Sequence, residues 1–270
     1  MASDAWCAIH QPNLFPRLST LAKLWSADTW VVLGDVQFTR QAYQQRCRLA
    51  AISDPAGQQW LTIPVHLPHG RQTTIDQVKI TDPQATRLRV RRLLQQYYGR
   101  SRHWPAFEEA VGQAMTILDR TDLLADFTEQ SSRALLTALG WRGTIVRSSQ
   151  FRARDGRSER LARLTCAAGA RTYLCGTGGA RYLDQWPFAS HGLRVAYFTT
   201  PTQGDQRIWQ DASKITAIRA LMTVGPSALS DALHQHAANL RQAAEEANPH
   251  PRALAGSLAA DRPPATGIPA

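Results

Sequence analysis

The residues best suited to chemistry stand near the N-terminus, in the stretch His-Gln-Pro-Asn at 10–13. A neutral imidazole such as that of His10 can act near pH 7 as a general base on an amine or hydroxyl nucleophile. The amides of Gln11 and Asn13 could hydrogen-bond a substrate carbonyl or a ribose. The alternative, the default for a lone histidine, is that His10 caps a strand or fills the core. Pro12 fixes an irregular loop at this point, which favours a site.

A carboxylate and an amide follow the next apolar stretch, which covers 29–33. Asp35 could orient His10, bind a substrate ammonium or hold a sugar hydroxyl, and Gln37 is expected at the same edge. The alternative for Asp35 is a turn or helix-cap aspartate, which is common after a glycine. We predict Asp35 as a catalytic residue and Gln37 as a substrate-binding one.

Two further pairs have the chemistry to bind an anion or a carbonyl. Arg46 and Arg48 alternate as on one face of a strand or loop, and their forks match phosphate or carboxylate. A solvated surface pair is nearly as good an explanation. Ser148 and Ser149 also follow an apolar stretch and could donate to a phosphate or a carbonyl. Since no G-x-S-x-G elbow surrounds these serines, a serine nucleophile is not expected.

A glycine-rich turn, Gly-Thr-Gly-Gly, occupies 176–179 after another apolar stretch. The backbone amides of Gly176, Gly178 and Gly179 could cradle a phosphate. The turn satisfies neither the GxGxxG nor the Walker pattern, and the alternative is a tight turn that needs positive φ. Tyr182, which stands close by, supports a binding role.

Hydrophobic spacing predicts the elements that must position these residues. Short stretches rich in β-formers predict strands at 6–9, 29–33, 59–65, 75–80, 144–146, 172–175 and 194–198. Helical periodicity predicts helices at 18–25, 83–98, 104–118, 121–139, 157–168, 212–223 and 226–245. The order strand, loop, helix, strand over the first 33 residues is a βαβ unit with parallel strands. It places the loop at 10–17 at the carboxyl edge of a sheet, where open α/β sheets bind ligands.

Composition bounds the class of protein. No stretch of the 270 residues approaches the roughly 20 apolar residues that span a bilayer, and no secretory signal is visible. We therefore expect a cytoplasmic protein without a membrane partner. The four cysteines form no CxxC pair, so reduced thiols are expected, with no metal and no cofactor. We expect one α/β domain over 1–246 and a disordered Pro/Ala-rich tail over 247–270.

The formal net charge is +10, and only three of the 31 basic residues are lysines. The arginines concentrate at 87–102 and at 147–163. One explanation is an anionic partner such as nucleic acid, a sugar nucleotide or an acyl carrier. The other is the codon bias of a GC-rich genome. The sequence does not decide between them.

Several short motifs, in this order, resemble the WbqC-like family over about residues 7–225. They are the stretch 9–13, Pro16, Ala22-Lys23, 27–28, 32–33, 35–38, Gln44, Arg46, Arg48, 60–65, Ser148-Ser149, Gly169-Ala170 and 173–183. The resemblance adds Lys23 to the substrate-binding residues expected above. Members of the family occur with genes for O-antigen polysaccharides and other secondary products, and a glycine transferase role has been proposed for some.

The sequence departs from the family next to the expected site. Arg17, Ser19 and Thr20 stand where the family has an aromatic residue and a Gly-Tyr pair. The family's paired acids are reduced to Gly-Asp at 34–35, and its Asn-Arg-Asn run appears as Gln-Arg-Cys at 45–47. These changes bear on which substrate the site takes.

The opening strand, loop and helix are also analogous to the start of HIGH-type nucleotidylyltransferases. The histidine pair of those enzymes is absent, since Pro-Arg-Leu-Ser occupies 16–19, and 151–154 contains no lysine of a KMSKS kind. The fold class predicted is therefore α/β, with a parallel Rossmann-like (HIGH-type nucleotidylyltransferase-like) core, a helical segment and C-terminal helices, without adenylylation.

The function predicted is transfer of an aminoacyl group, glycyl among the candidates, to an amino group of a sugar or secondary-metabolite intermediate. His10 would be the base, and the donor would be activated elsewhere, as an aminoacyl-tRNA or a carrier-bound acyl group. The alternatives are a nucleotidylyltransferase or ATP-dependent amide ligase, and a non-catalytic protein that binds tRNA or a sugar nucleotide.

Overall fold

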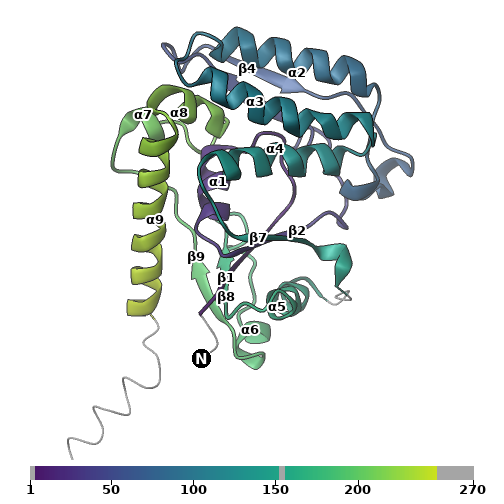
Figure 1. The fold of residues 1–270 in the computed structure, drawn as a ribbon. Coiled ribbons are helices and arrows are strands. Elements are labelled where there is room, and N and C mark those ends of the chain that lie inside the picture. The colour runs from purple at the N-terminus through teal and green to yellow at the C-terminus, as the bar shows by residue number, and fades with distance from the viewer. Residues whose placement is uncertain (1–3, 152–155, 248–270) are drawn as a thin grey trace, which may run out of the picture.

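A five-stranded parallel sheet forms the centre of the computed structural model, which describes residues 4–151 and 156–247 (Figure 1). The strand order is β7-β2-β1-β8-β9. The bounds are β1 (Trp6–His10), β2 (Thr29–Val32), β7 (Thr144–Arg147), β8 (Thr172–Cys175) and β9 (Arg194–Tyr197). From β1 the chain adds strands outward to β7, then returns to the other side of β1 for β8 and β9. The predicted parallel, Rossmann-like core is confirmed.

The return of the chain makes the gap between β1 and β8 a topological switch point, the usual place for a ligand in such sheets. Cys7 of β1 is level with Tyr173 of β8 and with Thr29 of β2. His10 therefore closes β1 at the carboxyl edge of the sheet, level with Val32. The sequence prediction for the position of His10 is confirmed.

Alternate strand residues face two layers of helices, as the period of two requires. Trp6 and Ala8 belong to the larger apolar cluster, which includes α1, α4, α8 and α9. Cys7 and Ile9 belong to a smaller cluster with α5 and α6. The bounds are α1 (Leu18–Trp25), α4 (Leu124–Ala138), α5 (Arg157–Ala167), α6 (Trp186–Ser190), α7 (Gln206–Trp209), α8 (Ala217–Val224) and α9 (Pro226–Ala247).

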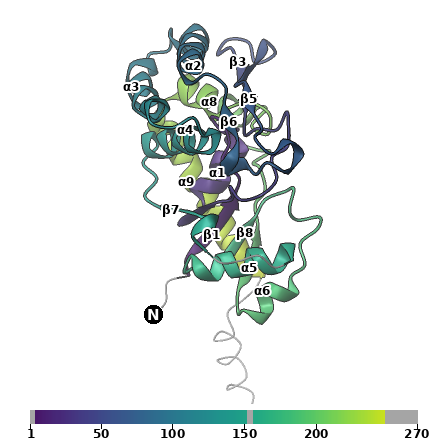
Figure 2. The ribbon, with the colours of Figure 1, turned by 90° about the vertical axis from the view of Figure 1, so that its right-hand side faces the viewer.

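A helical segment covers the larger cluster on the side away from α5 (Figure 2). It contains two short antiparallel hairpins and the helices α2 and α3. The bounds are β3 (Arg46–Ala50), β4 (Gln58–Thr62), β5 (Val65–His66), β6 (Lys79–Ile80), α2 (Pro83–Tyr98) and α3 (Trp104–Met115), with short 3-10 turns at η1 (Gly70–Gln72), η2 (Ile75–Gln77), η3 (Thr116–Asp119) and η4 (Ser148–Gln150). Leu49 and Leu94 join the same apolar cluster as Trp6, so the segment and the sheet share one core.

Three predicted elements differ from the structure. The strand predicted at 75–80 is a 3-10 turn, capped by Thr74 and Gln77, followed by the two residues of β6. The strand predicted at 59–65 is interrupted between β4 and β5, where Pro64 lacks the N–H that a ladder needs. The helix predicted at 212–223 begins only at α8, because the Thr216 side chain caps its N-terminus.

Two predictions fall partly outside the described residues. The tail predicted over 247–270 lies outside them from residue 248 on, as do residues 152–155 of the second arginine-rich stretch. Among the helices that the structure describes, none is long and apolar enough to cross a membrane.

Candidate functional site

His10 is held by partners at both ring nitrogens. Its Nδ1 lies 3.4 Å from Nζ of Lys23, and its Nε2 lies 3.3 Å from Nδ2 of Asn13. The backbone carbonyl of His10 accepts from the indole N–H of Trp30 at 3.1 Å and from the amide of Leu33 at 3.0 Å. The end of β1, the helix α1 and the following loop therefore fix the imidazole together.

Burial holds the pKa of His10 well below its ordinary value of 6.5, and the positive charges of Lys23 and Arg17 lower this pKa further. The imidazole is therefore neutral at pH 7, with one N–H and one acceptor nitrogen. Which nitrogen carries the proton depends on the charge of Lys23, because a charged ammonium can only donate to Nδ1.

Lys23 is a buried lysine, 4% exposed, in the last turn of α1. Its ammonium donates to the carbonyl of Ile9 at 3.1 Å. Burial lowers the pKa of Lys23 to about 8, although the thiols of Cys175 and Cys7 nearby act in the opposite direction. Burial also raises the pKa of Cys7 to about 12, so that thiol keeps its proton. Within the described residues no carboxylate pairs with Lys23, and a buried lysine without a counter-charge marks a candidate functional group.

The glycine-rich turn after β8 leaves room for these side chains. A Cβ at Gly176 would lie 3.4 Å from Cδ of Lys23, and one at Gly179 would lie 3.0 Å from Sγ of Cys175. None of the glycines at 176–179 has positive φ. A need for positive φ therefore does not explain why glycine stands at these positions. The amides of Gly179 and Ala180 both donate to the Gly176 carbonyl. The phosphate cradle stays a prediction, and one of its three amides, that of Gly179, already donates inside the turn.

The loop after β1 is fastened to α4. The carbonyl of Asn13 accepts from the hydroxyls of Ser131 at 3.3 Å and Ser132 at 3.0 Å. The amide of Phe15 donates to Ser131 at 3.0 Å, and Phe15 has a φ of 37°, which is costly for a residue with a Cβ. A strained loop of this kind persists because the surrounding helix determines its shape.

Asp35 lies in a second group of polar residues. Its carboxylate accepts from the hydroxyl of Ser148, after β7, and pairs with Arg160 of α5 at 2.6 Å. The nitrogens of the His10 ring are taken by Lys23 and Asn13, so these contacts give no support to Asp35 as the residue that orients His10.

Three other predicted site residues point to different partners. Gln37 donates to the backbone carbonyl of Arg71 at 2.7 Å, and Ser149 is exposed beside the buried Ser148. Tyr182 is 68% exposed, with the guanidinium of Arg157 above its ring at 5.8 Å from the centroid. Their binding roles stay predictions.

Gln11 connects the His10 loop to the strand that carries Arg46 and Arg48. Its side-chain oxygen accepts from the amide of Gln44, two residues before β3. Arg46 and Arg48 both stack on Trp60 of β4, as their alternation predicts. The structure therefore brings them to the same side of β3, beside the loop.

Sequence reasoning missed several residues that shape the site. They are Arg17, Tyr43, Trp60, the serines Ser131 and Ser132, and the thiols Cys7 and Cys175. Two adjacent serines within an apolar helix pattern are a detectable signal of a buried polar contact. The stacking of arginines on aromatic rings depends on how distant segments pack and gives no local signal.

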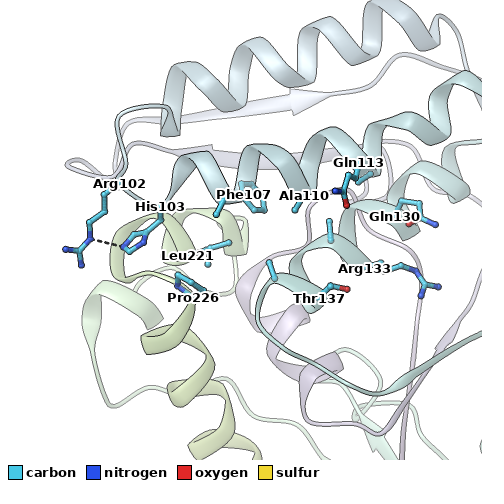
Figure 3. Close-up of a pocket in the computed structure, with 14 residues that line it drawn as sticks. Arg102, His103, Phe107, Ala110, Gln113, Gln130, Arg133, Thr137, Leu221 and Pro226 are labelled. Atoms are coloured by element: carbon cyan, nitrogen blue, oxygen red, sulfur yellow. Dashed lines mark hydrogen bonds between the residues drawn. The ribbon is translucent and has the colours of Figure 1, made fainter.

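A cavity of about 470 Å³ lies elsewhere, between α3, α4 and the α8–α9 junction (Figure 3). Phe107 and several alanines make most of its wall, with His103 at one end and Arg133 toward the other. Its described lining holds no carboxylate, thiol or serine. In the described part of the chain no group of three or more His, Cys, Asp or Glu side chains could hold a metal ion.

Comparisons with known proteins add the family. The sequence model of the WbqC-like protein family matches residues 11–231. The chain is similar to the uncharacterized protein Rv1507c of Mycobacterium tuberculosis, with 25% identity over 198 residues, which cover 71% of this chain and 80% of that protein. No solved structure matches the chain.

Proposed function

Because this chain belongs to the WbqC-like protein family, we propose that it is a biosynthetic enzyme that transfers an acyl or aminoacyl group to an amine. The acceptor is an amino group of a sugar or secondary-metabolite intermediate, and glycyl is among the groups transferred. The observation that carries the proposal is the contact between His10 and the buried Lys23 at the switch point of the sheet. Two bases of different strength in contact form a path for the proton that amine acylation releases.

In the proposed reaction the amine nitrogen attacks the acyl carbonyl carbon and a new C–N bond forms. The bond from that carbon to the donor's oxygen or sulfur breaks, and the leaving atom keeps the electron pair. The relay runs in molecules whose Lys23 is neutral, a form that becomes the major one above pH 8. The amine proton then passes to Nε2 of His10, while the proton on Nδ1 moves to Nζ of Lys23. Lys23 is the final acceptor because its pKa, about 8, lies above the lowered pKa of His10.

We assign the other polar side chains of the site to substrate binding. Asn13, whose amide faces Nε2 of His10, and Gln11 are placed to hold the acyl carbonyl or the acceptor. Asp35 is proposed to bind the acceptor's ammonium before it is deprotonated, with Ser148 and Arg160 fixing the carboxylate. A carboxylate that binds the amine would orient it for attack on the acyl carbon.

A small activated donor fits the charge distribution better than a transfer RNA. The two arginine-rich stretches lie on α2 and around α5, at opposite ends of the molecule in both views (Figures 1 and 2). This separation of the two stretches favours a small donor over an extended polyanion. Several of their arginines also pair with acids, as Arg91 does with Glu108 and Arg163 with Glu159. Aminoacyl-tRNA is retained as a donor to be tested.

A nucleotidylyltransferase or ATP-dependent amide ligase is the second candidate. The strand order and the switch point favour it, because nucleotide-binding sheets share both. The analogy between the opening strand, loop and helix and HIGH-type nucleotidylyltransferases also supports this candidate. It differs from the first in consuming a nucleoside triphosphate, with release of pyrophosphate where the intermediate is a nucleotidyl adduct and of phosphate where it is an acyl phosphate.

A donor screen separates the candidates. The purified chain is incubated with an amine acceptor and one of three donors: an aminoacyl-tRNA, a carrier thioester, or a free amino acid with ATP. We expect an amide product by mass spectrometry from a preactivated donor, without release of pyrophosphate or phosphate. Release of either with the free amino acid and ATP would establish the ligase instead. Ligand binding without turnover of any donor would favour a non-catalytic binding protein.

A further inference from the structure

Three arginines beside the His10 loop are stacked on two aromatic rings. The guanidinium carbon of Arg17, which ends the loop, lies 4.0 Å from the ring centroid of Tyr43. Those of Arg46 and Arg48 lie 4.1 and 4.4 Å from the ring of Trp60. The two rings are 5.8 Å apart, so the five side chains form one assembly, the arginine–aromatic cluster.

The arginines of the cluster differ from the other half-buried arginines of the described chain. Each of the others pairs with a carboxylate: Arg87 with Asp119, Arg160 with Asp35, Arg194 with Asp4 and Arg241 with Asp28. No described carboxylate pairs with Arg17, Arg46 or Arg48. Their neutral partners are the Ser213 carbonyl for Arg17 and the Gln58 side chain for Arg48, each at 3.0 Å. Three neighbouring positive charges repel one another until an anion joins them.

The Nε atoms of the cluster also lack acceptors, as do those of Arg87 and Arg160. The Nε atom of each of the three arginines is shielded from solvent and has no hydrogen-bond partner. An unmet buried donor destabilises the folded chain. The aromatic faces fix the guanidinium planes and leave the N–H edges as the groups that can bind. Guanidinium edges held in advance match the oxygens of phosphate groups, which accept two parallel N–H bonds.

The cluster borders the proposed reaction site. Arg17 is close enough to lower the pKa of His10, and Gln44, next to Tyr43 in the chain, donates to Gln11. An anion bound by the cluster would therefore lie beside His10 and offset the charge of Arg17. Phosphate binding would then raise the pKa of His10, so that a correctly bound substrate makes His10 a stronger base.

We propose that the arginine–aromatic cluster binds the diphosphate group of one substrate, so that the enzyme acts on a diphosphate-linked molecule. Three guanidiniums exceed what a single carboxylate needs and match the charge of two linked phosphates. The assignment to a substrate rests on the proposed function. Binding of the anion itself does not, which keeps the two tests separate.

Isothermal titration of the full chain with inorganic pyrophosphate tests the proposal. The double variant Arg46→Gln/Arg48→Gln keeps polar side chains at both positions, although shorter ones, and removes two charges. We expect it to bind pyrophosphate at least about tenfold more weakly than the wild type, because charge-assisted bonds are lost. Arg17→Gln, a single change that leaves β3 intact, should act in the same direction. The matched control is Arg89→Gln/Arg92→Gln on the exposed side of α2, which removes the same charge and should bind as the wild type does.

Equal affinity in the cluster variant and the control, or no binding by the wild type, would overturn the proposal. His10→Ala distinguishes this inference from the proposed function. We expect it to bind pyrophosphate but to lose turnover. If His10→Ala kept full turnover while the arginine variants lost binding, the proposed mechanism would fail and the diphosphate site would stand.

Discussion

At the level of single residues, the site depends on two bases in contact, His10 and the buried Lys23. We expect His10→Ala to lower turnover by about 10²–10⁴-fold, the range for a general acid or base. The fold should persist, because the strand is anchored through the backbone carbonyl of His10, which the variant keeps. Steady-state kinetics and thermal unfolding on the same samples check this. A histidine with only a packing role would show lost stability and a proportionate loss of activity.

We expect Lys23→Met to make the folded chain more stable while it removes activity. In the folded chain the pKa of Lys23 is about 8, below its ordinary value of 10.5. Burial of the charged ammonium at pH 7 therefore lowers the free energy of unfolding. The shift corresponds to about 3 kcal/mol, of which lost hydrogen bonds offset about 1 kcal/mol. We expect Lys23→Met to raise the free energy of unfolding by about 1–2 kcal/mol at pH 7 and to abolish turnover.

The sign of the pH dependence follows from the same shift. Between pH 8 and 10.5 the unfolded wild type keeps a proton on Lys23 that the folded chain has lost, so wild-type stability gains as the pH rises through this window. The advantage of Lys23→Met should therefore be full below pH 8 and vanish toward pH 10.5. Urea unfolding at several pH values measures it, with Lys214→Met, at an exposed position, as the control. A destabilised Lys23→Met at pH 7 would contradict the account.

At the scale of elements, α4 sets the shape of the loop that carries Asn13. Ser132→Ala removes a buried donor to the Asn13 carbonyl, so we expect a loss of about 1–2 kcal/mol in the free energy of unfolding. Turnover should fall more than stability explains, because the loop also positions the amide that faces His10. Kinetics well below the unfolding temperature separate the two effects. Thr137→Ala, on the same helix but away from the loop, is the control, and equal effects in both variants would exclude a positioning role.

Much of the element scale could be predicted from the sequence. The five strands of the sheet and the βαβ opening follow from apolar stretches, and their order places His10 at the carboxyl edge. The 3-10 turn at η2 could not be predicted from the sequence. Its residues alternate like those of a strand, while Thr74 and Gln77 cap a turn. The environment of Lys23 could not be predicted either. Gly176 and Cys175 lie close to Lys23 only because the chain returns to the sheet as β8, beside β1.

At the scale of the whole molecule, the residues after Ala247 should be dispensable. Their Pro/Ala-rich composition cannot bury enough apolar area to offset chain entropy. We expect a chain truncated after Ala247 to keep the wild-type melting temperature and turnover. Differential scanning fluorimetry and the acylation assay compare the two chains. A lower melting temperature in the truncated chain would show that the tail contributes to the fold.

Lys23, a lysine with a lowered pKa, contacts His10 and is the proposed proton acceptor. The chain has only three lysines, Lys23, Lys79 and Lys214, and the last two pair with carboxylates on the surface. An NMR titration of ¹³C-labelled lysine side chains therefore resolves each one, with Lys23→Met to assign the signal of Lys23. The account predicts that this signal titrates near pH 8. A titration of Lys23 near its ordinary value of 10.5 would contradict the proposed role.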